Sequence, residues 1–361
     1  MNLEAITKLF ECKKAAFTVK AEISLRINDE MFRPGTVRVH LPAPINASWL
    51  KEGQLLSTSP EFRMVSTEDY PQRSIYYNEI LKENTVFSAS YAFESVHSYL
   101  KPDLELCDQT EQKGWSPAQS AAFSGTHHCE CESYTALKPD MIRPGDICEE
   151  EGIRFLQTYK DFLKDYGIDP DSEELHKLSM TERGTLARKI YDLITEKYIP
   201  AKDETLNIVF VSMCRMCGIP ARWQGGWHTK DIIENTSSQP IQASGHDWAL
   251  IHIMPYGFIF ADCENAKKAG NMKIPGSDES LKEYFFGNID PCMVPTASAP
   301  SRDLYPAKDY ERADKIFNTF GEVELIPGKM SSEGHFEGYG LKIGEFGSNI
   351  TIQVYSSSSA I

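Results

Sequence analysis

The sequence predicts an α+β protein in which a β-rich region precedes a mixed region of helices and strands. Apolar residues at every second position of residues 17–27 indicate a strand with one buried face. Residues 186–194 carry apolar side chains at helical spacing, and residues 206–217 form a largely apolar segment of helical length. At 361 residues the chain exceeds one typical domain, so we expect two.

The first part of the chain, residues 1–100, is expected to form an N-terminal β-sandwich-like domain. A second alternating run covers residues 37–41 and ends at Pro42, which cannot donate a hydrogen bond within a sheet. Residues 74–77 and 86–93 provide two more strand candidates. Several short strands with turn residues between them are typical of a small sandwich.

The rest of the chain is expected to form an irregular connection, residues 101–147, and then an α+β core, residues 148–361. Helices are predicted over residues 153–163, between Thr181 and Pro200, and over residues 206–217, where Gly218 ends the helix. Strands of the core are predicted at residues 248–253, 258–261, 340–343 and 350–355.

Composition restricts the classes of partner. The net charge of -15 argues against a nucleic-acid partner, because phosphate binding depends on clustered Lys and Arg. No stretch approaches the roughly 20 apolar residues of a membrane span, and acidic residues interrupt the N-terminal segment, unlike a secretory signal. Nine scattered cysteines are not typical of a disulfide framework. We therefore expect a cytoplasmic protein without a membrane or nucleic-acid partner.

One set of motifs points to a family. Residues 218–222 read Gly-Ile-Pro-Ala-Arg, and they are followed by His246, by Trp248 two positions later, and by Asp262. Helix, motif and strands in this order resemble the transglutaminase-like superfamily, and its bacterial branch in particular. The resemblance is strongest over residues 181–262 and looser over residues 285–291. It implies a papain-like core.

The resemblance also implies a Cys-His-Asp triad. The family places a cysteine at the N-terminus of a buried helix, where the helix dipole stabilises its thiolate. A histidine takes the thiol proton and an aspartate fixes its tautomer; His246 and Asp262 match these two positions. The register set by Arg215 and Gly218 places Asp203, not a cysteine, at the nucleophile position. Cys214 lies eleven residues further along, about 16 Å away on a helix.

Two functional hypotheses follow from the missing cysteine. In the leading one, Asp203 caps its helix in a site that has lost catalysis, and the cleft binds a peptide, protein or small-molecule ligand. In the alternative, Asp203, His246 and Asp262 act together as a hydrolase or transferase on an amide, ester or glycoside. The resemblance suggests that a further set of side chains lines the cleft, although aromatic residues also dominate cores. This set consists of Trp223, Gln224, Trp227 and Trp248.

We expect neither a metal nor an organic cofactor. His127, His128, Cys129 and Cys131 form a tempting cluster, but a Cys-x-Cys pair lacks the spacing of structural zinc sites. Cys214 and Cys217 have the spacing of a redox motif, yet they lie in a predicted core helix, which favours burial as small apolar residues.

Overall fold

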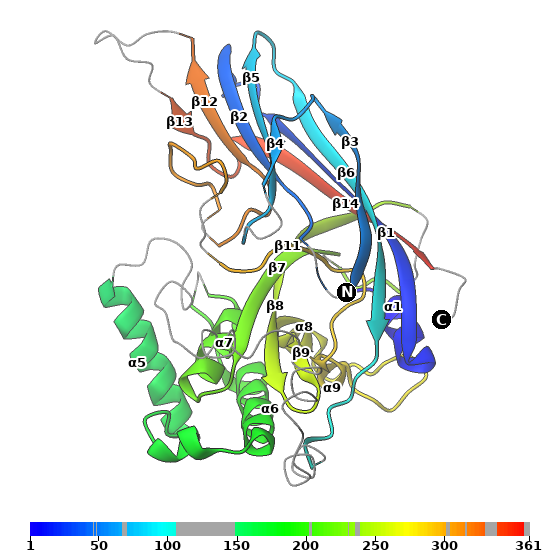
Figure 1. The fold of residues 1–361 in the computed structure, drawn as a ribbon, viewed down its shortest axis with the longest axis vertical. Helices are drawn as coiled ribbons and strands as arrows, with labels where there is room; N and C mark the ends of the chain where they lie inside the picture. The colour runs from blue at the N-terminus through cyan, green and yellow to red at the C-terminus, as the bar shows by residue number, and fades with distance from the viewer. Residues whose placement is uncertain are drawn as a thin grey trace, which may run out of the picture. The chain divides into compact units, whose positions relative to one another are not determined.

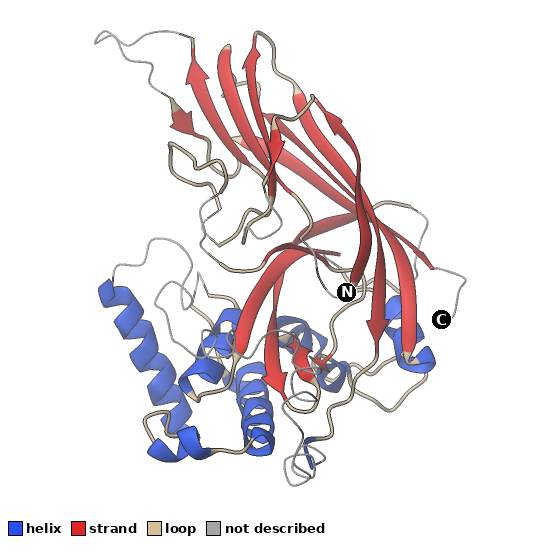
Figure 2. Cartoon of the chain, viewed as in Figure 1, coloured by secondary structure: helices blue, strands red, loops and turns tan. Residues whose placement is uncertain are grey.

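The computed structural model describes residues 1–45, 47, 49–66, 71–105, 149–201, 204–229, 231–234, 239–300, 304–314, 316–328 and 338–356. The predicted irregular connection therefore lies almost wholly outside the described residues. The mixture of helices and strands agrees with the predicted α+β class (Figure 2). None of the helices in these described segments is long and apolar enough to cross a membrane.

The chain divides into two compact units. Unit 1 comprises Met1–Ser98, Gly225–His246 and Asp290–Ile361, and unit 2 comprises Tyr99–Gln224 and Asp247–Ile289. Strands β7 (Ala221–Thr229) and β8 (Ile241–Ile253) each run from one unit into the other along the chain.

Unit 1 is built from two antiparallel sheets (Figure 1). In the first, neighbouring strands are β14 (Phe346–Ser356), β1 (Lys14–Ile27), β6 (Val86–Ser98) and β3 (Leu50–Ser59). The second has the order β13 (Tyr339–Gly340), β12 (Glu322–Pro327), β2 (Gly35–Pro42), β5 (Ser74–Leu81) and β4 (Met64–Val65). Helix α1 (Leu3–Cys12) precedes β1, and β11 (Val294–Ala297) pairs with β7.

The alternation that predicted the first strand sets the packing between these sheets. Along β1, Val19, Ile23 and Leu25 are buried while most of their neighbours are exposed or half-buried. Across the interface the ring of Tyr77 on β5 meets the ring of Phe87 on β6 edge-on, with 5.2 Å between centroids. The predicted sandwich-like arrangement is therefore present.

The late strands pair with the N-terminal ones. Strand β14 pairs with β1 over the whole register from Phe17↔Ser356 to Ile27↔Phe346, and β12 pairs with β2. Unit 1 thus takes in strands that the predicted boundaries place with residues 148–361. The difference arises because pairing between segments more than 280 residues apart leaves no local signal in the sequence.

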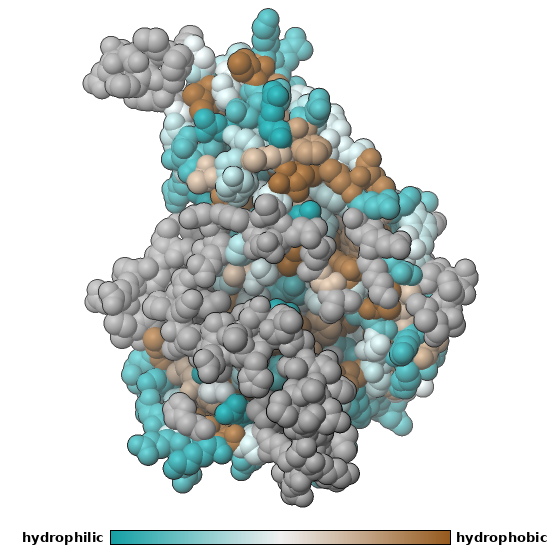
Figure 3. All heavy atoms as spheres, viewed as in Figure 1, coloured by the Kyte–Doolittle hydropathy of each residue, from teal (hydrophilic) through white to brown (hydrophobic). Residues whose placement is uncertain are grey.

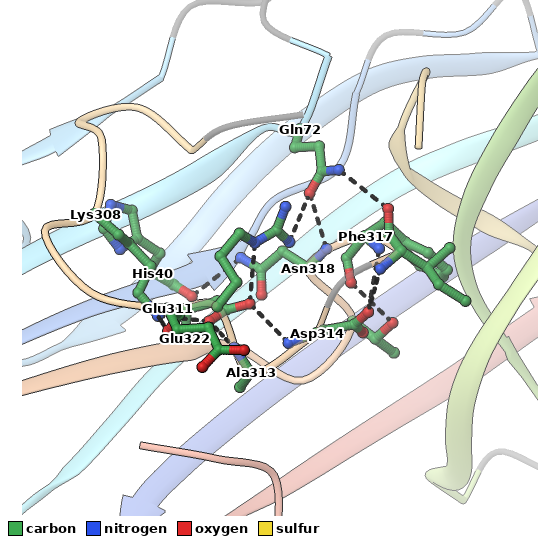
Figure 4. A network of polar contacts seen from close by, with 12 residues as sticks. His40, Gln72, Lys308, Glu311, Ala313, Asp314, Phe317, Asn318 and Glu322 are labelled. Carbon is green, nitrogen blue, oxygen red and sulfur yellow. Dashed lines mark hydrogen bonds and ion pairs between the residues drawn. The ribbon is translucent and has the colours of Figure 1, made fainter. Parts of the chain in front are cut away.

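A buried carboxylate holds the segment 308–314 against β12 in unit 1 (Figure 4). Glu322 accepts hydrogen bonds from Lys308 Nζ at 2.7 Å and Arg312 Nε at 3.2 Å. It also accepts the backbone N–H groups of Ala313 and Asp314. Two cations and two amides therefore compensate a fully buried charge, as a buried carboxylate requires.

Unit 2 combines helices with short antiparallel strands. Its helices are α5 (Glu149–Asp165), α6 (Met180–Lys197), α7 (Leu206–Met216), α8 (Cys263–Ala269) and α9 (Leu281–Tyr284), with a 3-10 turn at Glu173–Lys177. The C-terminal half of β8 pairs with β9 (Gly257–Ala261), which pairs in turn with β10 (Phe286–Gly287). Helix α7 is buried from Leu206 to Arg215 and contacts α5, α6 and α8.

The surface carries scattered apolar side chains among polar ones (Figure 3). The most exposed in unit 1 is Ile80, at 82%, and in unit 2 it is Ile199, at 85%. Isolated apolar side chains are ordinary on protein surfaces, so they do not by themselves indicate a binding face.

Candidate functional site

The start of helix α7 is the part of unit 2 where the family places its nucleophile. The helix begins at Leu206, and Thr205 caps it by accepting the Ile208 N–H on its hydroxyl oxygen at 3.2 Å. Asp203, the residue in register with the family cysteine, lies outside the described residues. Its predicted place in the site therefore stays a prediction.

A buried carboxylate that the sequence analysis did not single out stands beside this helix start. Asp247 is 3% exposed, and its Oδ2 accepts hydrogen bonds from the Thr205 hydroxyl at 2.6 Å and from Trp223 Nε1 at 2.5 Å. A negative charge near a helix N-terminus is favoured by the helix dipole. The chain therefore supplies an anion of its own at the start of α7.

Two further side chains, one in the first turn of α7 and one in α8, connect this helix start to β8 and α8. Asn207 donates from Nδ2 to the carbonyl of Asp247 and accepts the Cys263 N–H on Oδ1, both at 2.8 Å. The Leu206 N–H donates to Glu264 Oε1 at 3.2 Å. Because the first N–H groups of a helix have no partner within it, these contacts satisfy donors that would otherwise be buried without one.

Asp262, a predicted triad residue, is fully buried at the end of β9 in unit 2. It caps helix α8: Oδ1 accepts the Asn265 N–H at 2.9 Å, and Oδ2 accepts Asn265 Nδ2 at 2.8 Å. Its own N–H donates to the Phe285 carbonyl at 3.0 Å. These contacts fix the carboxylate, while its role in orienting His246 stays a prediction.

His246, the predicted base, belongs to unit 1 and is half-buried on β8. Its ring lies against that of His228 on β7, with 4.8 Å between centroids and 37° between planes. His228 is buried, and its Nε2 lies 3.4 Å from Oδ2 of the fully buried Asp290. The described part of unit 1 therefore groups two imidazoles and one carboxylate, a cluster we call the His-His-Asp cluster.

The electrostatics of the cluster follow from burial. Burial lowers the pKa of His228 to about 4, because a charged imidazole loses its hydration. Burial alone would oppose ionisation of Asp290, but the neighbouring His228 and the Cys292 N–H hold its pKa below the usual range. The sequence analysis missed both residues, although residues 285–291, which contain Asp290, already resembled the family.

The four predicted cleft residues are buried. Trp223 donates to Asp247, Trp248 donates from Nε1 to Gln224 Oε1 at 2.9 Å, and Trp227 donates from Nε1 to the Thr319 carbonyl at 3.0 Å. Each indole N–H thus has an acceptor within its own unit. In this structure the four side chains pack, and their role as ligand contacts stays a prediction.

The described cysteines of unit 2 are not activated thiols. Cys214, Cys217 and Cys263 are buried, and burial raises the pKa of Cys217 to about 12 and the pKa of the other two well above the ordinary value. A thiol must ionise to act as a nucleophile, so these three are poorly suited to catalysis. In unit 1, Cys12 is exposed and Cys292 is buried.

The predicted histidine and cysteine cluster at His127, His128, Cys129 and Cys131 lies outside the described residues. Within the residues that are described, no group of three or more His, Cys, Asp or Glu side chains could hold a metal ion.

Comparison with known proteins identifies the type of this core. The model of the transglutaminase-like superfamily matches residues 178–263, a span that contains α6, α7, His246 and Asp262. The chain has a transglutaminase-like core. The resemblance that Gly-Ile-Pro-Ala-Arg and His-x-Trp predicted is therefore confirmed over this core.

Similarity beyond this core is low. A crystal structure of a putative cysteine protease from Cytophaga hutchinsonii aligns over 96% of this chain and 92% of that one, with 12% identity and a TM-score of 0.43. No curated protein matches the transglutaminase-like chain.

Proposed function

We propose that this chain is a transglutaminase-like protein that has lost the nucleophilic cysteine and binds a ligand without catalysis. The ligand is a peptide, a protein or a small molecule held in the cleft that the family resemblance implies. The observation that carries the proposal is the start of α7, where Thr205 and Asp247 meet and the register offers Asp203 in place of a thiol.

The chemistry at this helix start supports the proposal. A helix N-terminus activates a cysteine by stabilising its thiolate. Here the buried carboxylate of Asp247 already stands at the first turn, and Glu264 accepts the first helical N–H. The described cysteines of unit 2 are buried with raised pKa values, so none of them offers a substitute thiolate near neutral pH.

The test for catalysis is a turnover screen on the full chain. We expect no product from a glutamine peptide with an amine acceptor, nor from peptide, ester or glycoside substrates. Any turnover that is lost in His246→Ala and in Asp203→Asn, but kept in Gln242→Ala, would overturn the proposal in favour of the enzyme with changed chemistry. Gln242 is an exposed residue of the same strand, so its replacement controls for general damage to β8.

The test for binding uses the same compounds as probes in calorimetric titrations. We expect at least one of them to bind the wild-type chain and Gln242→Ala equally, and to bind His246→Ala at least tenfold more weakly. If no peptide or small molecule binds, or if His246→Ala binds all of them as tightly as the wild type, the proposed ligand site is wrong.

A further inference from the structure

The His-His-Asp cluster of unit 1 contains an imidazole that no step of the family's triad uses. His228 is enclosed on β7, whereas His246 beside it is half-buried. We propose that His228 is a positioning residue for His246: it fixes the His246 ring and limits the imidazole pair to one proton, which His246 carries. The consequence for ligand binding rests on the proposed function, but the proton itself can be measured without a ligand.

His228 is held in place within unit 1. Its strand β7 pairs with β11, and the register places the neighbouring Trp227 opposite Val294. The carboxylate that faces the ring, Asp290, is itself fixed, since Oδ2 accepts the Asn2 N–H at 2.5 Å and Oδ1 accepts the Cys292 N–H at 2.9 Å. A fixed ring can orient the neighbour that packs on it.

The Nε2 atom of His228 is on the side of the ring that faces Asp290. This nitrogen lies 3.4 Å from Asp290 Oδ2, without the alignment of a full hydrogen bond. In a neutral imidazole only one nitrogen carries a proton, and the other is an acceptor. A carboxylate on the Nε2 side favours the tautomer with the proton on that nitrogen, as in carboxylate–histidine pairs generally. Asp290 therefore selects one tautomer of His228.

Protonation of both imidazole rings at once is electrostatically unfavourable. If both rings were protonated, two cations would lie with their centroids 4.8 Å apart in a largely enclosed space, and this repulsion is strong where water is excluded. The carboxylate that faces His228 is Asp290, which also accepts the Asn2 and Cys292 N–H groups. Its attraction does not offset burial, which still lowers the pKa of His228 to about 4.

The difference in burial between the two rings determines which of them takes the single proton. His228 is buried, and burial disfavours its charged form; His246 retains access to water. His97, another buried histidine near Asp290, also has its pKa lowered to about 4 by burial, so it does not compete for the proton near neutral pH. The single proton therefore belongs to His246.

The experiment is a histidine NMR titration of the full chain, labelled at the imidazole carbons. In the wild type, His228 should stay neutral until the pH falls to about 4, while His246 takes up its proton at a higher pH. In His246→Gln the neighbouring imidazolium is absent, so a proton should bind His228 about tenfold more tightly, a shift of about one pH unit upward. His246→Phe keeps a flat ring without a charge, so it should give the same upward shift of the His228 titration.

His252→Gln, which alters a buried histidine of unit 2, serves as the control and should leave the His228 titration unchanged. If His246→Gln fails to fold, His246→Phe remains as the test. The proposal is overturned if His228 titrates at the same pH in the wild type and in the folded His246 variants. It is also overturned if His228 takes up a proton near its ordinary pKa in the wild type. Neither result depends on whether a ligand binds, so failure here is distinguishable from failure of the proposed function.

Discussion

The starts of helices α6 and α7, both in unit 2, are capped in different ways. At α6, Ser179 accepts the Glu182 N–H at 3.3 Å and Glu182 accepts the Ser179 N–H at 2.7 Å, so four consecutive residues complete the cap. At α7, Thr205 bonds Asp247, 42 positions away, and the first helical N–H bonds Glu264, 58 positions away. The first start is completed locally, whereas the second adds, to the local cap by Thr205, contacts that exist only in the folded core.

The difference between the two helix starts shows which of them depends on the rest of the core. A local capping box can form on any surface helix, and it carries no information about function. A helix start made by β7, β8 and α8 together requires the whole transglutaminase-like core to be in place. The contacts of the core thus converge on the helix start where the family places its nucleophile. Changes at α7 should therefore destabilise unit 2 far more than changes at α6.

The largest effect is expected at Asp247. Asp247→Ala leaves the Thr205 hydroxyl and the Trp223 N–H buried without this acceptor, so it should destabilise unit 2 by about 3 kcal/mol. The measurement is the hydrogen-exchange protection of the α7 amides. In the background of Trp223→Phe, which lacks the indole donor, the loss should be smaller, and equal losses in both backgrounds would contradict the geometry.

A smaller effect is expected at Asn207, which joins β8 to α8. Asn207→Ala removes the acceptor of the Cys263 N–H and the donor to the Asp247 carbonyl, and should cost about 2 kcal/mol. Asn207→Asp keeps an acceptor for Cys263 but lacks the donor, which separates the two contacts. Denaturant unfolding measures the free energy of unfolding of both variants. If Asn207→Ala lowers it no more than an exposed substitution does, the contact between Asn207 and α8 does not stabilise unit 2.

At α6 the expected loss is smaller still. Ser179→Ala removes one cap of an exposed helix start and should cost about 1 kcal/mol. The same denaturant series that measures Asn207→Ala provides the comparison. A loss at Ser179 that equals or exceeds the loss at Asp247 would break the distinction between the two helix starts.

The smallest effect is a pH dependence at α6. The backbone hydrogen bond from Ser179 lowers the pKa of Glu182 below its ordinary value. A carboxyl group with a lowered pKa in the folded state stabilises it above the unfolded pKa and ceases to do so as the pH falls. Wild type and Glu182→Gln should therefore differ in stability at pH 6 and converge near pH 3. A constant difference across this range would show that the carboxylate is not part of the cap.

Local signals in the sequence predicted most elements of the fold. The apolar run before Gly218 predicted a helix over residues 206–217, and α7 spans Leu206–Met216. The start of α6 was placed after Thr181, two residues late, because the Ser179 and Glu182 capping pattern was overlooked. Helix α1 was not predicted, although Asn2 and the spacing of the apolar residues after it are a helix signal.

Contacts between distant segments determine the features of the fold and of the site that local sequence patterns do not predict. The pairing of β14 with β1, and so the membership of unit 1, depends on residues more than 300 positions apart. At the candidate site, the spacing of His246 and Asp262 predicts their roles. Asp247 lies in the same motif, but nothing in the sequence indicates that Thr205 and Trp223 donate hydrogen bonds to it. His228 was missed for the same reason, since only the pairing of strands places it beside His246.

The central claim is that no cysteine of this chain works with His246. The most direct test is to alkylate the full chain at neutral pH and to follow each cysteine by mass spectrometry in the wild type, His246→Ala and Gln242→Ala. The account predicts that the labelling rate of every cysteine, Cys12 included, is the same in all three proteins. A cysteine whose labelling slows tenfold or more in His246→Ala alone would be an activated thiol, and would contradict the loss of the nucleophile.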